Sequence, residues 1–322
     1  MKLKHIFSFG LAASLVLITC IPAWAGSRAY ITNQGSDNVS VIDLGNNQVI
    51  ASIDVGKAPV GVAISTKLHR VFISNVDSQN ISVINSDSNQ LIGEIKISGS
   101  PVGLALSPDS STLYVADWFD DRVIAINTSD IQQQREVSVG KSPAGMVVSP
   151  DGKTLYIANR DSNDIALIDT TSLAIVSRIP VGKHPFGVAL SQDGQQLYAV
   201  NVKSNSISAI NTSTSEVHTI KVGDHPYCVT VSPDGQTVYV SNTQGDSISV
   251  IDVAQMKSIA TIAVGSFPEG VSFDQATQKV YVANWGGNSV SVIDALSNKL
   301  IASIATGLQS RAFGQFIAET AH

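Results

Sequence analysis

The chain has 322 residues, of which 43% are hydrophobic and 14% charged, and its formal net charge is −6. This balance excludes an intrinsically disordered chain, and it disfavours nucleic acid as a partner because an acidic surface repels phosphates. Aromatic residues are scarce at 6%, whereas Gly, Val and Ile are frequent. We therefore expect short β-strands, tight turns and a core of aliphatic side chains.

The first 25 residues differ in character from the rest of the chain. Two lysines precede an apolar run from Ile6 to Ile18, and Ala23-Trp24-Ala25 forms a small-x-small cleavage site before Gly26. This pattern predicts a secretory signal peptide over residues 1–25 and a periplasmic or secreted protein. A membrane anchor is the main alternative, but the run is shorter than the roughly twenty residues a spanning helix needs. Lipid attachment at Cys20 is a lesser alternative.

Cleavage changes the charge and the cysteine content of the remaining chain. The mature protein has 18 basic and 26 acidic residues, a net charge of −8, and keeps Cys228 as its single cysteine. No disulfide can then form within the chain, so burial of the core must supply its stability. Residues 26–322 are expected to form one domain without a transmembrane span, and to be monomeric.

Glycines mark a repeat throughout the mature chain. They recur at spacings of 43, 41, 42, 41, 42 and 42 residues, each at the end of a β-rich run: Gly56, Gly99, Gly140, Gly182, Gly223, Gly265 and Gly307. A regular period of this length indicates a repeat architecture, in which each unit is one supersecondary element. Seven marks predict seven units.

Residues 141–182 show the content of one unit. Apolar runs over 145–149, 155–158, 165–168 and 175–181 are separated by polar turns, and the first turn is Pro150-Asp151-Gly152. Four short strands per period, with no space for a helix, predict the blade of a β-propeller. A parallel β-helix is the alternative, but its coils are shorter. The predicted fold is therefore all-β, a seven-bladed β-propeller of four-stranded blades.

The two ends of the mature chain complement one another. Residues 28–56 contain only the last three strands of a unit, and a single further segment, Arg311 to Ala318, ends the chain. We expect this C-terminal strand to complete the first blade, because closing the ring removes exposed sheet edges.

Tyr156-Ile157-Ala158-Asn159, Tyr239-Val240-Ser241-Asn242 and Tyr281-Val282-Ala283-Asn284 are repeated second strands. With the ending Arg311-Ala312-Phe313-Gly314-Gln315-Phe316-Ile317, they make the chain resemble the YVTN-repeat β-propeller family. The resemblance covers essentially everything after residue 25. It implies a propeller fold and export, but it does not choose among the periplasmic binding proteins, redox-enzyme subunits, lactonase-like enzymes and surface proteins of this group.

Polar residues that recur in every unit are interpreted as structural. An Asn or Asp closes each second strand, where its short side chain can bond to the nearby backbone: Asn33, Asn75, Asp117, Asn159, Asn201, Asn242 and Asn284. Information about function is expected where the units differ.

The loops between second and third strands emerge on the same face as the Gly-x-x-Pro connections between units. This loop-rich face is the predicted binding surface, and the variable residues of the connections should surround the mouth of the central channel. Distinctive side chains occur there in the later units, namely His184, Phe186, His225, Tyr227, Glu269 and Arg311. The outer loops add Trp118, Phe119 and Arg160, an aromatic and Arg combination typical of contact surfaces.

His184 and His225 occupy the same position in adjacent units. They could share a ligand or a divalent metal such as Zn, Cu or Ni, with Glu269 or Asp224 as oxygen donors. No tight His-x-x-x-His or Cys-x-x-Cys spacing accompanies them, so surface histidines are the favoured interpretation and no cofactor is predicted. Cys228 replaces a repeated glycine next to a strand and is expected to be a buried, inert thiol.

The preferred functional prediction is an exported binding module whose loop-rich face holds a ligand, polymer or protein. The alternative is an enzyme or enzyme subunit, either lactonase-like or an accessory subunit of a periplasmic quinone or haem dehydrogenase, in which His184, His225 and Glu269 converge. Whether the protein is an enzyme stays open, with binding favoured. Nucleic-acid binding would require Arg122, Arg160, Lys203 and Arg311 to form one basic patch.

Overall fold

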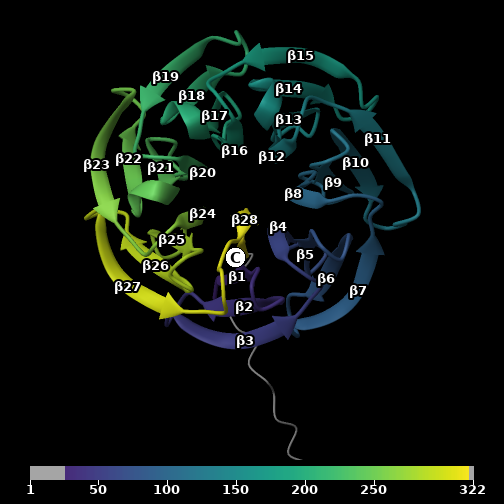
Figure 1. The fold of residues 1–322 in the computed structure, drawn as a ribbon, viewed down its shortest axis with the longest axis horizontal. Coiled ribbons are helices and arrows are strands. Elements are labelled where there is room, and N and C mark those ends of the chain that lie inside the picture. The colour runs from purple at the N-terminus through teal and green to yellow at the C-terminus, as the bar shows by residue number, and fades with distance from the viewer. Residues whose placement is uncertain (1–25, 319–322) are drawn as a thin grey trace, which may run out of the picture.

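The protein is a seven-bladed β-propeller, as a computed structural model that describes residues 26–318 shows. Seven sheets stand around a central axis, and the two ends of the described chain meet in one blade (Figure 1). The predicted fold is thereby confirmed. The predicted signal peptide, residues 1–25, lies outside the described residues. Within these residues, no helix has the length and apolar character that a membrane span requires.

The strands follow one another from the axis outwards in blades 2 to 7, whereas in blade 1 a strand from the end of the chain lies inside the first three. The first four blades contain β1 (Arg28–Asn33), β2 (Asn38–Asp43) and β3 (Gln48–Asp54); β4 (Pro59–Ser65), β5 (Arg70–Asn75), β6 (Asn80–Asn85) and β7 (Gln90–Lys96); β8 (Pro101–Leu106), β9 (Thr112–Asp117), β10 (Arg122–Asn127) and β11 (Gln134–Ser138); and β12 (Pro143–Val148), β13 (Thr154–Asn159), β14 (Asp164–Asp169) and β15 (Ile175–Pro180).

The last three blades contain β16 (Pro185–Leu190), β17 (Gln196–Asn201), β18 (Ser206–Asn211) and β19 (Val217–Lys221); β20 (Pro226–Val231), β21 (Thr237–Asn242), β22 (Ser247–Asp252) and β23 (Lys257–Ala263); and β24 (Pro268–Asp274), β25 (Lys279–Asn284), β26 (Ser289–Asp294) and β27 (Lys299–Ala305). The short strands β28 (Phe313–Gly314) and β29 (Ile317–Ala318) follow, and three-residue 3-10 turns occur at Arg160–Ser162, Val202–Ser204 and Thr243–Gly245.

The core lies between the blades. Second and third strands are buried on both faces because each blade packs against two neighbours, and the tyrosines Tyr30, Tyr198, Tyr239 and Tyr281 are among the largest fully buried side chains. Packing is tightest along the inner strands, where a Cβ added to Gly103 would lie 1.9 Å from the carbonyl oxygen of Ala144 in the next blade. The repeated Pro-x-Gly motif follows from this close approach, since only glycine lacks the Cβ that would collide.

The repeated Asn residues are buried and structural, but their bonds differ from the predicted backbone turns. The amide of Asn201 donates to the hydroxyls of Ser206 and Ser208 on the adjacent third strand, at 3.3 and 3.0 Å. The Asn side chains also pack against the repeated glycines, because a Cβ at Gly182 would lie 2.6 Å from Cγ of Asn201. The repeated glycine and the repeated Asn are thus in direct contact, which explains why they recur together.

The C-terminal segment closes the ring through the first blade, as predicted. Strand β29 pairs antiparallel with β1, and the N–H of Tyr30 donates to the carbonyl of Phe316 at 2.8 Å. We compare how far the inner strand advances while its partner, the second strand, is followed back four positions from the repeated Asn. In blade 2 the inner strand advances five residues, from Pro59 to Ile64. In the closing segment it advances seven residues, from Ser310 to Ile317. The two additional residues let β28 leave this blade and pair in parallel with β4.

Candidate binding face

The connections on the loop-rich face are held by hydrogen bonds from one blade to the next. The residue before the proline has a left-handed backbone, with φ of 54° at His184 and 49° at His225. Its N–H donates to a side chain in the preceding loop, namely from His184 to Oδ1 of Asn163 at 2.8 Å and from His225 to Oδ1 of Asn205 at 3.1 Å. The loops and connections of this face therefore form one continuous hydrogen-bonded rim.

The channel is closed at the loop-rich face, although the sequence predicts an open mouth there. The middle residue of each Pro-x-Gly unit, or its counterpart, points to the axis, and we call these seven residues the axial ring: Val60, Val102, Ala144, Phe186, Tyr227, Glu269 and Arg311. All seven are buried or partly buried. The ring of Phe313, which the longer closing segment brings to the axis, packs with them and is itself buried.

Aromatic side chains from three blades and the closing segment form a continuous cluster around Phe313. The ring centroids of Phe186 lie 4.2 Å from Tyr227, 4.9 Å from Phe313 and 5.8 Å from Trp118. The guanidinium of Arg160 stacks over Trp118, with Cζ 5.7 Å from the ring centroid. Four of the predicted site residues, Trp118, Arg160, Phe186 and Tyr227, therefore do lie together, and they form a packed support beneath the face.

Arg311 and Glu269 form a buried ion pair at the edge of this cluster. Nε of Arg311 lies 2.6 Å from Oε2 of Glu269, in an alignment that favours ionic attraction over a linear hydrogen bond. The remaining nitrogens of Arg311 donate to Oη of Tyr227 at 2.5 Å and to Oε1 of Gln34 at 3.1 Å. Burial raises the pKa of Glu269, and the adjacent Arg311 partly offsets this rise. Glu269 is thus held by Arg311 and buried.

His184 and His225 face different partners. Nε2 of His184 lies 3.8 Å from Oδ1 of Asp161, and its Nδ1 has no hydrogen-bond partner among residues 26–318. Burial, and then the charge of Arg160, lower the pKa of His184. Nδ1 and Nε2 of His225 lie 3.1 Å from Asp224 and 3.3 Å from Nζ of Lys203.

No three or more His, Cys, Asp or Glu side chains converge within the described part of the chain. The structure therefore does not bring His184, His225 and Glu269 into one catalytic group. A metal shared by the two histidines stays a prediction.

Exposed apolar side chains project from the same face. Phe119 follows Trp118 in the loop between β9 and β10 and is 73% exposed. In the connection to blade 7, Phe267 is 45% exposed and meets the edge of Trp285, whose Nε1 donates to Gln34 at 3.2 Å. Phe119 and Phe267 are therefore aromatic side chains that the fold leaves available on a rigid base.

The four cations required for nucleic-acid binding do not form one open patch. The guanidinium of Arg122 is paired with Asp117, Asp120 and Glu136, at 3.0, 3.4 and 2.7 Å. The side chain of Arg311 is only 20% exposed and is paired with Glu269. Arg160 and Lys203 alone remain on the loop-rich face.

Several structural roles lay beyond the sequence interpretation. Asp117 occupies the position of the repeated Asn residues, yet it is a buried carboxylate that Arg122 neutralises. The signal was present, because blade 3 alone combines Asp and Arg at these two positions. Cys228 is buried as predicted, and burial raises the pKa of its thiol.

Comparisons with known proteins agree with the fold. Residues 122–230 match the family described as lactonase, 7-bladed beta-propeller, and residues 189–278 match the YNCE-like beta-propeller family. Each match covers less than half of the chain. A 40-residue segment, 12% of the chain, is 55% identical to the PE-PGRS family protein PE_PGRS18 of Mycobacterium tuberculosis, of which it spans only 9%.

Three solved structures share the architecture. A functionally unknown protein from Desulfotomaculum acetoxidans superposes with a TM-score of 0.78 at 15% identity, over 90% of this chain and 98% of that one. Hydrazine synthase of Kuenenia stuttgartiensis gives 0.71 at 21% identity, over 82% and 96%. The dihydro-heme d1 dehydrogenase NirN in complex with DHE gives 0.66 at 13% identity, over 86% and 63%. At these identities the likeness is one of fold, and it extends to two enzymes and one protein of unknown function.

Proposed function

We propose that the protein is an exported binding module whose loop-rich face holds a protein partner. The observation that carries this proposal is Phe119, a 73% exposed aromatic side chain at the tip of a loop whose neighbour, Trp118, is fixed by Phe186 and Arg160. Exposing an aromatic ring is unfavourable in water, and a ring on a rigid base loses little conformational entropy on binding.

The surroundings of Phe119 suit a protein surface. Ion pairs border it on the same face, including Lys141 with Asp121 at 2.6 Å and Arg160 with Asp161 at 2.6 Å. An apolar anchor within a polar border is the usual composition of a specific interface. The closed channel mouth also favours a broad surface over a deep pocket on this face.

Site-specific photo-crosslinking in the exporting cells tests this proposal. We expect a photoreactive phenylalanine at position 119 or 267 to give an adduct of the same size with one partner. Leu296, which is 84% exposed on the opposite face between β26 and β27, is the matched control and should give none.

The substitution Phe119→Ala should also abolish the adduct formed from position 267. Equal adducts from positions 119 and 296, or none from either aromatic position, would contradict the proposal.

A further inference from the structure

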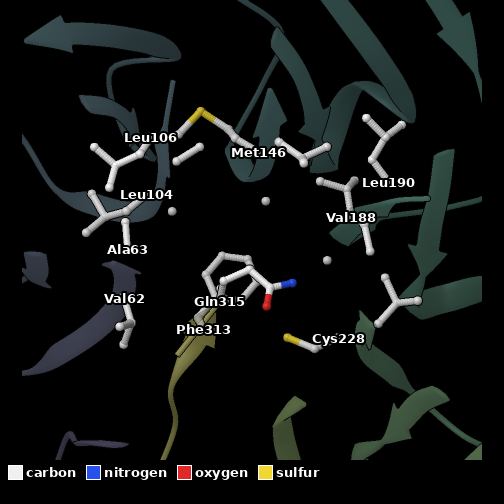
Figure 2. A pocket seen from close by; sticks show the side chains of 18 of the residues that line it. Val62, Ala63, Leu104, Leu106, Met146, Val188, Leu190, Cys228, Phe313 and Gln315 are labelled. Carbon is white, nitrogen blue, oxygen red and sulfur yellow. The ribbon is translucent and has the colours of Figure 1, made fainter. Parts of the chain in front are cut away.

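A cavity of about 250 Å³ lies on the axis, on the far side of Phe313 from the loop-rich face. Figure 2 shows the side chains around it, among them Leu104, Met146, Val188 and Leu190 from the inner strands of three blades. Phe313 and Gln315 of the closing segment also line it. The cavity is therefore bounded by several blades at once and exists only in the closed ring.

The cavity opens away from the proposed partner surface. The axial ring, whose members are buried or partly buried, and the buried Phe313 close the channel at the loop-rich face. The lining continues along the inner strands to Leu106 and Leu190, the residues at which β8 and β16 end before the turns of the opposite face. A molecule in the cavity would thus enter through that opposite face.

The lining has a definite chemical character. No charged side chain contributes to it, so an ion would lose its hydration without a compensating charge. Gln315 supplies an exposed amide that makes no hydrogen bond with any residue in the described range 26–318. Its nitrogen and oxygen can donate to and accept from one polar group of a ligand.

The walls offer further polar groups from the backbone. Strands β8, β12, β16 and β20 each have a strand neighbour on the outer side only, so their inner edges present free N–H and C=O groups to the axis. In β24 the N–H of Gly270 donates to the carbonyl of Arg311 at 3.0 Å, so part of this edge is already bonded. Strand β4 differs, because β28 pairs with its inner edge. A buried edge of this kind requires water or a ligand to satisfy it.

The closing segment builds this site specifically. Its two additional residues, relative to the other inner strands, are what bring Phe313, Gly314 and Gln315 across the channel. A strand of the usual length would close the first blade without dividing the channel. Closing the ring does not require the two additional residues, whereas forming one wall of a binding cavity does.

We propose that this cavity binds a small, uncharged, mostly apolar molecule that carries one amide or carbonyl group. The apolar side chains would contact its body, and the Gln315 amide and the free strand edges would bond to its polar group. This site is separate from the partner surface around Phe119, so either proposal can fail without the other.

Benzamide and benzoate form a matched pair of probes, since they share a ring and similar size but differ in charge. We expect ¹⁵N-labelled full-length mature protein to bind benzamide saturably, with shifts at the Gln315 side-chain amide and the inner-strand amides, and to bind benzoate far more weakly. The substitution Gln315→Leu should weaken benzamide binding about fivefold, the loss of one hydrogen bond.

Filling the cavity provides a second, independent test. Val188→Phe should abolish benzamide binding, whereas Val176→Phe, the same change at an exposed site on the outer strand β15, should leave it unaltered. Equal binding of the two probes, shifts that map outside the cavity, or unchanged binding in Gln315→Leu would overturn the proposal. The probe comparison and Gln315→Leu decide the question even where Val188→Phe does not fold.

Discussion

Asp117 shows how a single position can depart from a repeat without loss of structure. In the other blades this position is Asn, and in three of them a Ser follows five residues later, as in the pair Asn201 and Ser206. Asp117 is fully buried, and its carboxylate receives Nε of Arg122 at 3.0 Å and the N–H of Ser100 at 2.9 Å. A buried charge of this kind requires its partner, because an unpaired carboxylate in the interior is strongly unfavourable.

We predict that Arg122→Ser lowers the free energy of unfolding by about 3 kcal/mol, since it leaves Asp117 buried and uncompensated. The double variant Asp117→Asn, Arg122→Ser restores the Asn and Ser arrangement of three other blades and should lie within about 1 kcal/mol of the wild type. Urea unfolding of the two single variants and the double variant measures these differences. Additive losses would show that the two residues act independently.

The connections between blades show a second regularity, at the level of the element. In six of the seven connections a side chain from the preceding loop accepts the N–H of the residue that leads into the next blade, and Asn163 does so for His184 at 2.8 Å. Asp121 and Asp246 make the same bond to Ser142 and Phe267, both at 2.8 Å. Asn and Asp are suited to this role because they tolerate the left-handed backbone and carry an acceptor.

We predict that Asn163→Gly destabilises the protein by about 1 kcal/mol, because glycine keeps the backbone conformation but removes the acceptor. Asn163→Asp, which retains the acceptor, is the matched control and should be nearly neutral. Hydrogen exchange at the His184 amide should accelerate in Asn163→Gly alone. Unchanged exchange in that variant would show that the bond does not hold the connection.

The strands and the number of blades could be predicted because their signals are local and repeated. Each strand has its own alternation of apolar and polar residues, and each turn has its own Pro-Asp-Gly or Asn. An ambiguous signal in one unit is therefore resolved by comparison with the other six. That Trp118, Arg160, Phe186 and Tyr227 share one face could also be predicted, because each lies in a loop or connection of that face. The closed channel mouth could not be predicted, because it depends on Phe313. The position of Phe313 is set by two additional residues in the closing segment, and no other unit of the chain shows this insertion.

At the scale of the molecule, Arg311 joins the end of the chain to three blades. It contacts Glu269 in blade 7, Tyr227 in blade 6 and Gln34 in blade 1. Ala312 and Phe316, on either side of Phe313, are fully buried in the core between the last blade and the first. Ring closure therefore combines apolar burial with one ion pair, and the ion pair makes its strength depend on pH.

We predict that Arg311→Ala lowers the free energy of unfolding by about 3 kcal/mol at neutral pH, because Glu269 stays buried without its partner. Burial already raises the pKa of Glu269, and loss of the guanidinium raises it further. The folded variant then takes up a proton at a higher pH than its unfolded chain does, so acidification stabilises the folded state relative to the unfolded one. The difference from wild type should therefore shrink at about pH 5, above the ordinary range of Glu.

Glu269→Gln combined with Arg311→Ala removes the charge and should show no such pH dependence. An equal loss for Arg311→Ala at both pH values, measured by urea unfolding, would show that the ion pair does not hold the ring closed.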